Sequence, residues 1–288
     1  MTNPLRALVK RIESFKGVDG PAKAVSTAVS EIPGPGPIKD VLSGSVIGHA
    51  LHPMLADVVI GSFISANALD VIGGKESHTA SERLIALGIA AYPPTALTGT
   101  SDWADGSVGN LAVRRVGVVH AVANSAALAL YAASLAARKR GDRTKGVALG
   151  FAGAGALGFA GYLGGHLSYV NGWGVDQTAF DAGPTEWTEA TKIDGLAEGA
   201  LVRIVVDETP VLLVRRDGRV RAIHDRCSHR GCSLAARGEV SGDEIECTCH
   251  GSRFSLADGS LLRGPATQPQ PAFETRERDG ALEIRRYS

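Results

Sequence analysis

The middle of the chain restricts its fold more than any other part. Residues 44–172 are dominated by Ala, Gly, Leu and Val and carry few charges, whereas most charged residues lie outside them. About 20 apolar residues are needed to cross a bilayer, and four segments in this region approach or exceed that length: 48–72, 84–100, 116–137 and 147–169. The sequence therefore predicts a four-helix transmembrane domain over residues 44–172.

The second of these segments is short and contains Pro93 and Pro94, so we expect a kinked or partly buried span. The alternative is a soluble, alanine-rich helical bundle. It is disfavoured because the third and fourth segments have almost no polar face to present to water.

The remaining residues form three further parts. Residues 1–43 are a basic, partly amphipathic segment without the pattern of a cleavable signal peptide. Residues 173–191 are expected to be a linker and 192–288 a second folding unit, because 288 residues are enough for two. The formal net charge is zero, which offers no argument for nucleic acid as a partner. Membrane lipid is the partner that the composition indicates.

The last hundred residues have the pattern of a small antiparallel β-domain. Short alternating or β-branched runs occur at 200–206, 211–216, 219–224, 244–247, 272–275 and 281–285. Asp217-Gly218, Asp258-Gly259 and Asp279-Gly280 are turn signals between such runs.

Two short stretches of this unit each combine cysteine with histidine. A [2Fe–2S] cluster held by two thiolates on one iron and two imidazoles on the other requires C-x-H from one loop and C-x-x-H from a second. Zinc would more naturally use C-x-x-C. The spare cysteine in each loop could bridge the two loops. The stretches are Cys227-Ser-His229-Arg-Gly-Cys232 and Cys247-Thr-Cys249-His250.

Both stretches resemble the ligand boxes of Rieske proteins, including the seventeen residues between His229 and Cys247. The resemblance covers roughly the last hundred residues and implies an all-β Rieske domain. It also implies that Cys227 and Cys247 bind the first iron, and that His229 and His250 bind the second.

Features of two branches of that family are mixed in these boxes. Cys232 and Cys249 lie where the Rieske subunits of cytochrome bc complexes have a loop-to-loop disulfide, and Ser252 lies where those subunits have a serine that donates to a cluster sulfide. Arg230 and Phe254 instead resemble the soluble Rieske ferredoxins, since Phe254 replaces a tyrosine that donates to a ligand thiolate. Without that hydrogen bond the reduced cluster is stabilised less, so we expect an intermediate potential. Simple core filling is the alternative role for Phe254.

Polar residues of the predicted spans gather at one end of the membrane domain. When the direction of each span is traced, His52, Asp102, His120 and His166 fall near the end from which the chain enters the Rieske domain. Imidazoles at membrane depth are costly unless they are satisfied. Three roles stay open: the histidines could bind haem b in pairs, line a quinone site together with Asp102 or Asp57, or hydrogen-bond between helices.

The sequence around His49-Ala-Leu-His52-Pro and Gly164-Gly-His166 resembles a family of small bacterial four-helix membrane domains of unassigned function, over about residues 45–175. That resemblance implies a fold and no activity. Lys and Arg in the short loops lie mostly at the end opposite the histidines, which favours a cytoplasmic location for those loops. A disulfide also persists more readily outside the cytosol. We therefore expect a multi-pass protein of the cell membrane whose Rieske domain lies on the outer side.

Together these features predict an α plus β multidomain protein with a four-helix transmembrane bundle followed by an all-β Rieske domain. We expect it to transfer one electron at a time between a membrane donor, quinol or haem, and a redox partner protein. Only 38 residues follow His250, too few for a catalytic iron domain, so it would be an oxidoreductase component without its own substrate site. The alternative is a redox sensor or an assembly subunit of a respiratory or oxygenase complex.

Overall fold

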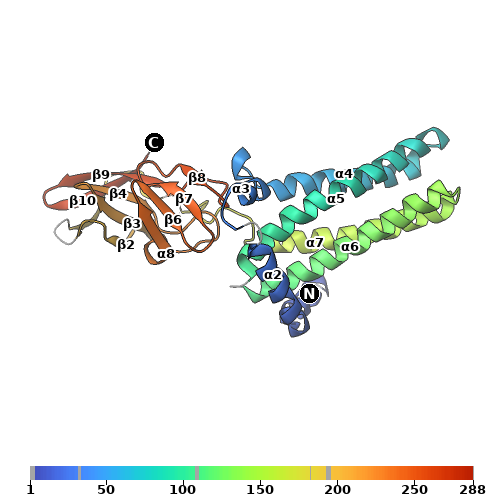
Figure 1. The fold of residues 1–288 in the computed structure, drawn as a ribbon, viewed down its shortest axis with the longest axis horizontal. Coiled ribbons are helices and arrows are strands. Elements are labelled where there is room, and N and C mark those ends of the chain that lie inside the picture. Colours follow the sequence, from blue (N-terminus) through green and yellow to red (C-terminus); the bar gives the residue numbers. More distant parts are fainter. Residues whose placement is uncertain (1–3, 32–33, 108–109, 182, 193–195, 288) are drawn as a thin grey trace. The chain divides into compact units, whose positions relative to one another are not determined.

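The computed structural model describes residues 4–31, 34–107, 110–181, 183–192 and 196–287. The chain divides into two compact units (Figure 1), of which one comprises residues 1–32 and 51–173 and the other residues 33–50 and 174–288. A few residues of each predicted part of the chain lie outside the described ranges. Each unit is treated by itself below.

The first unit is helical. Four long helices follow one another in this unit, and two further helices with a short 3-10 turn precede them in the chain. Among the described residues, α4, α6 and α7 are long and apolar enough to cross a membrane. The helices are α1 (Pro4–Ser14), η1 (Lys16–Val18), α2 (Asp19–Glu31), α4 (Leu51–Ile72), η3 (Lys75–Ser77), α5 (His78–Ser107), α6 (Leu111–Lys139) and α7 (Arg143–Tyr169).

Helix α5 differs from the other three long helices. It has 30 residues and contains Pro93 and Pro94, but it is not one of the three candidate spans. The expected four-span count is thus reduced to three candidates and one long helix that packs with them, and a four-helix transmembrane bundle stays a prediction.

Glycines let the long helices approach closely around aromatic rings. A Cβ on Gly88 would lie 2.5 Å from the Phe63 ring, and one on Gly153 would lie 2.9 Å from the Tyr131 ring. Phe63 and Tyr131 stack on each other with ring centroids 3.8 Å apart. Small residues that admit large neighbours are typical of helix packing in membranes.

One end of this bundle is tied together by buried charges. The side chains of Asp70 and Arg138 are fully buried and meet through two hydrogen bonds of 2.5 and 2.8 Å. Arg143 and Ser81 also donate to Asp70, at 2.8 and 2.9 Å. One carboxylate thereby links α4 to the three other long helices. Such a network stabilises a structure only when every charge is paired, as here.

The opposite end holds the N-terminal helices. Arg115 on α6 donates to both carboxylate oxygens of Asp19 on α2, at 2.8 and 2.6 Å, and to the carbonyl of Glu13 on α1 at 2.6 Å. Val9 of α1 is buried with Val116 and other apolar residues of α6 and α7. The basic N-terminal segment is therefore folded onto the bundle.

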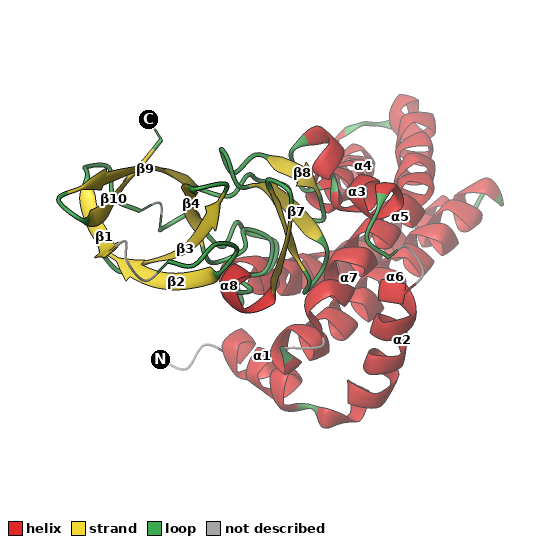
Figure 2. Cartoon of the chain, turned by 60° about the vertical axis from the view of Figure 1, so that its left-hand side comes forward, coloured by secondary structure: helices red, strands yellow, loops and turns green. Residues whose placement is uncertain are grey.

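The second unit is a β-domain with two antiparallel sheets. The six-stranded sheet has the order β1-β10-β9-β4-β3-β2 and curves until β1 and β2 are neighbours (Figure 2), and the four-stranded sheet has the order β5-β6-β7-β8. The unit also contains α3 (Pro37–Ser43), η2 (Ser45–Ile47) and α8 (Leu234–Arg237). The strands are β1 (Thr188–Lys192), β2 (Leu201–Val206), β3 (Thr209–Arg216), β4 (Arg219–His224), β5 (Gly238–Ser241), β6 (Glu244–Cys247), β7 (Ser252–Ser255), β8 (Leu261–Arg263), β9 (Ala272–Arg278) and β10 (Ala281–Arg286).

Two of the three predicted Asp-Gly pairs form tight hairpin turns, whereas Asp258-Gly259 lies in the longer connection between β7 and β8, where only the glycine has a positive φ. Asp217 and Gly218 have φ values of 49° and 72°, and Asp279 and Gly280 have values of 51° and 78°. Two successive positive φ values match the twist of an antiparallel hairpin, and aspartate and glycine adopt them at low cost. These turns fix the register of β3 with β4 and of β9 with β10.

Candidate metal centre

Two loops present the cysteine and histidine residues of the second unit. The first loop follows β4, and the second, residues 248–251, connects β6 to β7. Cys247 ends β6 and is paired across the ladder with Ser252 of β7. The positive φ of 87° at Gly251 turns the chain between these strands, a conformation that glycine adopts without strain.

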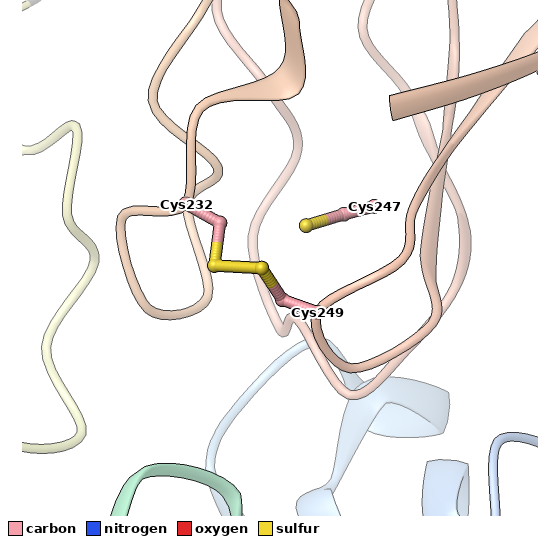
Figure 3. A group of neighbouring side chains, drawn as sticks. All are labelled: Cys232, Cys247 and Cys249. Atoms are coloured by element: carbon pink, nitrogen blue, oxygen red, sulfur yellow. A yellow bond between two sulfur atoms is a disulfide. The ribbon is translucent and has the colours of Figure 1, made fainter. Parts of the chain in front are cut away.

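The loops are joined by a disulfide between Cys232 and Cys249 (Figure 3). The sulfur atoms of these two residues and of Cys247 all lie within 4.8 Å of one another. The chain has four cysteines, so Cys227 and Cys247 are the thiols that remain, and both are buried. Any metal centre held here within one chain takes at most two thiolates, and its other ligands come from a different residue type.

The two free thiols interact with each other and with the main chain. A hydrogen bond from Cys227 lowers the pKa of Cys247 to about 7, although burial opposes the change. The pKa of Cys227 is raised by the same hydrogen bond and by its own burial. Backbone N–H groups also point at the sulfur atoms, two at each. They belong to His229, Arg230, Cys249 and His250.

The two imidazoles lie together on these same loops. The rings of His229 and His250 have centroids 5.0 Å apart and are nearly perpendicular. His229 is buried, whereas His250 is partly exposed. Two thiols and two imidazoles from two facing loops constitute the donor set that a mixed-ligand [2Fe–2S] centre requires, so the residues fit that group.

A buried glutamine holds the first loop in place. Gln270 donates to the carbonyls of His224 and Arg226, at 2.7 and 2.5 Å, and accepts from the Ser228 N–H at 3.0 Å. The Ser228 hydroxyl in turn donates to the Gln268 carbonyl at 3.1 Å. These residues were not among those predicted for the site. The signal that could have indicated them is a single glutamine between Pro269 and Pro271 in the connection from β8 to β9, residues 264–271, called the proline-rich loop below.

A charged cluster holds the second loop. Arg263 donates to the Gly251 carbonyl at 2.7 Å and to Glu246 at 2.9 Å. Arg253 donates to the other oxygen of Glu246 at 2.7 Å. The Gly251 carbonyl is thereby connected through Arg263 of β8 to Glu246 of β6.

The two predicted tuning residues lie beside the ligand loops. Ser252 is buried, and its Oγ accepts from the Ala266 N–H at 3.0 Å, which leaves the hydroxyl proton available to donate. Phe254 is fully buried in the apolar cluster that includes Cys227 and Cys247. Phe254 therefore fills the core next to the thiols, and it offers no donor to them.

His224 lies at the end of β4, just before the first loop. Its ring is fully buried, its Nδ1 accepts from the Arg226 N–H at 3.0 Å, and its Nε2 lies 3.2 Å from Asp181. Burial lowers the pKa of His224, while the neighbouring Asp181 opposes that shift. A histidine at a strand end of a small domain is usually exposed to solvent, but here the ring is buried beside Asp181.

Three histidines of the first unit, His52, His120 and His166, are engaged by neighbouring groups. His52 Nδ1 bonds to the Thr95 carbonyl at 2.9 Å. His120 Nδ1 bonds to the Ala160 carbonyl at 2.9 Å, and its Nε2 lies 3.1 Å from the Asn124 amide. His166 Nε2 lies 3.0 Å from Glu13 of α1.

These contacts bear on the three roles that the sequence left open. Both ring nitrogens of His120 are occupied, and the Nε2 of His166 is occupied by a carboxylate, so the haem b hypothesis gains no support from the structure. His52 and His120 lie within electrostatic range of each other, whereas His166 is bound to α1. Asp102 lies on α5 beside Trp103.

Comparison with known proteins agrees with this division of the chain. The model of the Rieske [2Fe-2S] domain matches residues 186–274. The ferredoxin component of a naphthalene 1,2-dioxygenase system from Pseudomonas putida is 31% identical over 83 residues, which make up 29% of this chain and 79% of that protein. The chain belongs to the Rieske [2Fe–2S] family. Members of this family bind a [2Fe–2S] cluster.

The helical unit matches a second family. Residues 48–177 match the model described as a predicted membrane protein, DUF2231. The protein is thus a fusion of a membrane domain with a Rieske domain.

Relatives of the Rieske domain come from more than one kind of system. Cytochrome b6-f complex iron-sulfur subunit 1 from Synechocystis sp. is 40% identical over 72 residues, or 24% of this chain and 39% of that protein. Among solved structures, the ferredoxin of carbazole 1,9a-dioxygenase from Nocardioides aromaticivorans IC177 is 27% identical, with a TM-score of 0.32, over 34% of this chain and 96% of its own. Both groups of relatives act in electron transfer.

Proposed function

We propose that this protein is a membrane-bound Rieske electron carrier that transfers one electron at a time between a membrane donor and a partner protein. The observation that carries the proposal is the convergence of two free thiols and two imidazoles on facing loops. Those loops belong to a domain fused to three helices of membrane-spanning length. A [2Fe–2S] centre with this ligand set supplies reversible one-electron chemistry when it is bound.

In this proposal Cys227 and Cys247 bind one iron, and His229 and His250 bind the other. The disulfide supports this assignment, because it leaves no other thiols in the chain. The backbone N–H groups aimed at the two sulfur atoms would stabilise negative charge on them and so favour the reduced state. His250 is the more exposed imidazole, so we propose that its ring faces the redox partner protein.

We further propose that the membrane donor is a quinol. The His52 ring uses Nδ1 toward the Thr95 carbonyl, so its neutral form keeps an acceptor lone pair on Nε2. That nitrogen could receive a proton from a quinol hydroxyl as the electron leaves. His120, with both nitrogens bonded, would position α6 against α7. The Rieske domain is proposed to lie on the outer side of a multi-pass protein, where the disulfide would persist.

Spectroscopy of ligand variants tests the cluster assignment. Cys227→Ser and His250→Ala should each abolish the electron paramagnetic resonance signal of the reduced protein, because each removes one of four ligands. His78→Ala, in the first turn of α5, is the matched control and should keep the full signal. An unchanged signal in both ligand variants would overturn the assignment.

The quinol proposal has its own test. His52→Gln should slow reduction of the protein by a quinol analogue, while chemical reduction by dithionite gives the full signal. Quinol reduction at the wild-type rate in this variant would exclude His52 as the proton acceptor.

A further inference from the structure

Residues 34–47 belong to the Rieske unit although they precede the membrane domain in the sequence. They form α3 and η2, and α4 begins at Leu51, four residues after Ile47. They lie outside both family matches, which cover residues 48–177 and 186–274. Neither family therefore accounts for this segment.

The inner face of the segment packs on the loops around the candidate metal centre. A Cβ on Gly251, next to His250, would lie 2.6 Å from Pro35. A Cβ on Gly264 would lie 1.9 Å from the Ser45 hydroxyl, so only glycine fits there without rearrangement. Gln268 donates to the carbonyl of Gly48, the residue directly after the segment, at 3.0 Å. The segment thus contacts both the second ligand loop and the proline-rich loop.

The outer face of the segment is apolar and exposed. Four branched aliphatic side chains in ten residues are more than half exposed, and the two charged residues of the segment are turned inward: Lys39 is buried and Asp40 is half-buried. A group of exposed aliphatic side chains this close together in the chain is unusual for a segment that meets only water and is typical of an interaction site. The exposed residues are Ile38, Val41, Val46 and Ile47, at 65%, 52%, 65% and 55%.

We propose that this outer face of α3–η2 inserts into the lipid headgroup region and holds the ligand loops at the bilayer surface. The inference rests on the membrane location in the proposed function. Lipid is the partner expected for this face because the segment leads into α4. Ile47 is four residues before Leu51, the start of a candidate span, and four residues of extended chain reach at most about 14 Å. The segment therefore cannot leave the neighbourhood of the interface, where apolar side chains are stabilised by contact with acyl chains.

Tryptophan depth measurements on the full chain in phosphatidylcholine nanodiscs test this inference. Val46→Trp and Ile38→Trp place the reporter on the outer face, at positions with room for a larger ring. The variants are compared in nanodiscs with and without bromine on the acyl chains, after subtraction of the emission of the native protein. We expect both added tryptophans to be quenched by the brominated lipid.

Two further variants separate the outcomes. Val205→Trp, at an exposed position of β2 in the same unit, should not be quenched. Ile60→Trp, in the middle of α4 and partly exposed, should be quenched strongly. If Ile60→Trp is quenched but Val46→Trp and Ile38→Trp behave like Val205→Trp, the inference is wrong and the membrane location stands. If Ile60→Trp is not quenched either, both the inference and the membrane location fail.

Discussion

Replacing Gln270 with alanine should destabilise the Rieske domain far more than the same change at Gln268 in the same loop. The side chain is almost completely buried and makes three hydrogen bonds to the main chain of the first ligand loop. Without it, the Ser228 N–H loses its acceptor and two carbonyls each lose a donor. An unsatisfied buried group costs about 1–3 kcal/mol, and a carbonyl that keeps a second bonding direction costs less. We therefore expect a loss of about 3 kcal/mol in the free energy of unfolding of the domain.

Thermal unfolding of the full chain measures this loss. For a domain of this size, 1 kcal/mol corresponds to about 4–8 °C in Tm, so Gln270→Ala should unfold roughly 12–24 °C lower than the native protein. The control is Gln268→Ala, which removes one exposed hydrogen bond to Gly48 from the same loop and should cost less than about 1 kcal/mol.

Hydrogen exchange gives a second readout that does not depend on any cofactor. The Ser228 amide should lose protection in Gln270→Ala and keep it in Gln268→Ala, because only Gln270 accepts from that N–H. Equal Tm values for the two variants, or a Ser228 amide that stays protected, would refute the role assigned to Gln270.

Three further predictions concern the same domain. Phe254→Tyr should raise the midpoint potential and Ser252→Ala should lower it. Each shift should be at most roughly 60–130 mV, the equivalent of one charge-assisted hydrogen bond of about 1.5–3 kcal/mol. Redox titrations that place the potentials of both variants within error of the native value would contradict this. Intact mass with and without reductant should differ by about two hydrogens, the number that reduction of one disulfide adds, and alkylation of Cys232 or Cys249 without reductant would contradict the disulfide. Burial lowers the pKa of His224 in the folded protein, so on acidification the unfolded state binds a proton at this imidazole before the folded state does. The stability of the domain should therefore fall as the pH drops below about 6.5. A Tm that stays constant from pH 7 to pH 5 would show that protonation of His224 is not linked to unfolding.

The sequence indicated the features whose signals are local. The ligand boxes could be read from their spacing alone, and the Asp-Gly turns require only adjacent residues that adopt positive φ. The disulfide was implied by the Rieske resemblance, and the structure contains it. The ligand roles of the two thiols and two imidazoles stay a proposal, which their convergence supports.

Contacts between distant parts of the chain had no such signal. Nothing in residues 34–47 indicates that they pack beside Gly251 and Gly264, more than two hundred positions later in the chain. The bonds from Arg115 to Asp19 and from His166 to Glu13 also join residues whose pairing depends on the whole helical arrangement. Polarity predicted that the buried histidines needed partners, but only the fold determines which groups those partners are.

The ligand set of the iron–sulfur centre is the central claim, and pulsed electron paramagnetic resonance of the reduced full-length protein tests it most directly. In protein labelled with ¹⁵N-histidine, the account predicts hyperfine couplings from two imidazole nitrogens, one of which belongs to His229 and the other to His250. A paramagnetic centre without coupled histidine nitrogen, or purified protein that contains zinc and no iron, would contradict it.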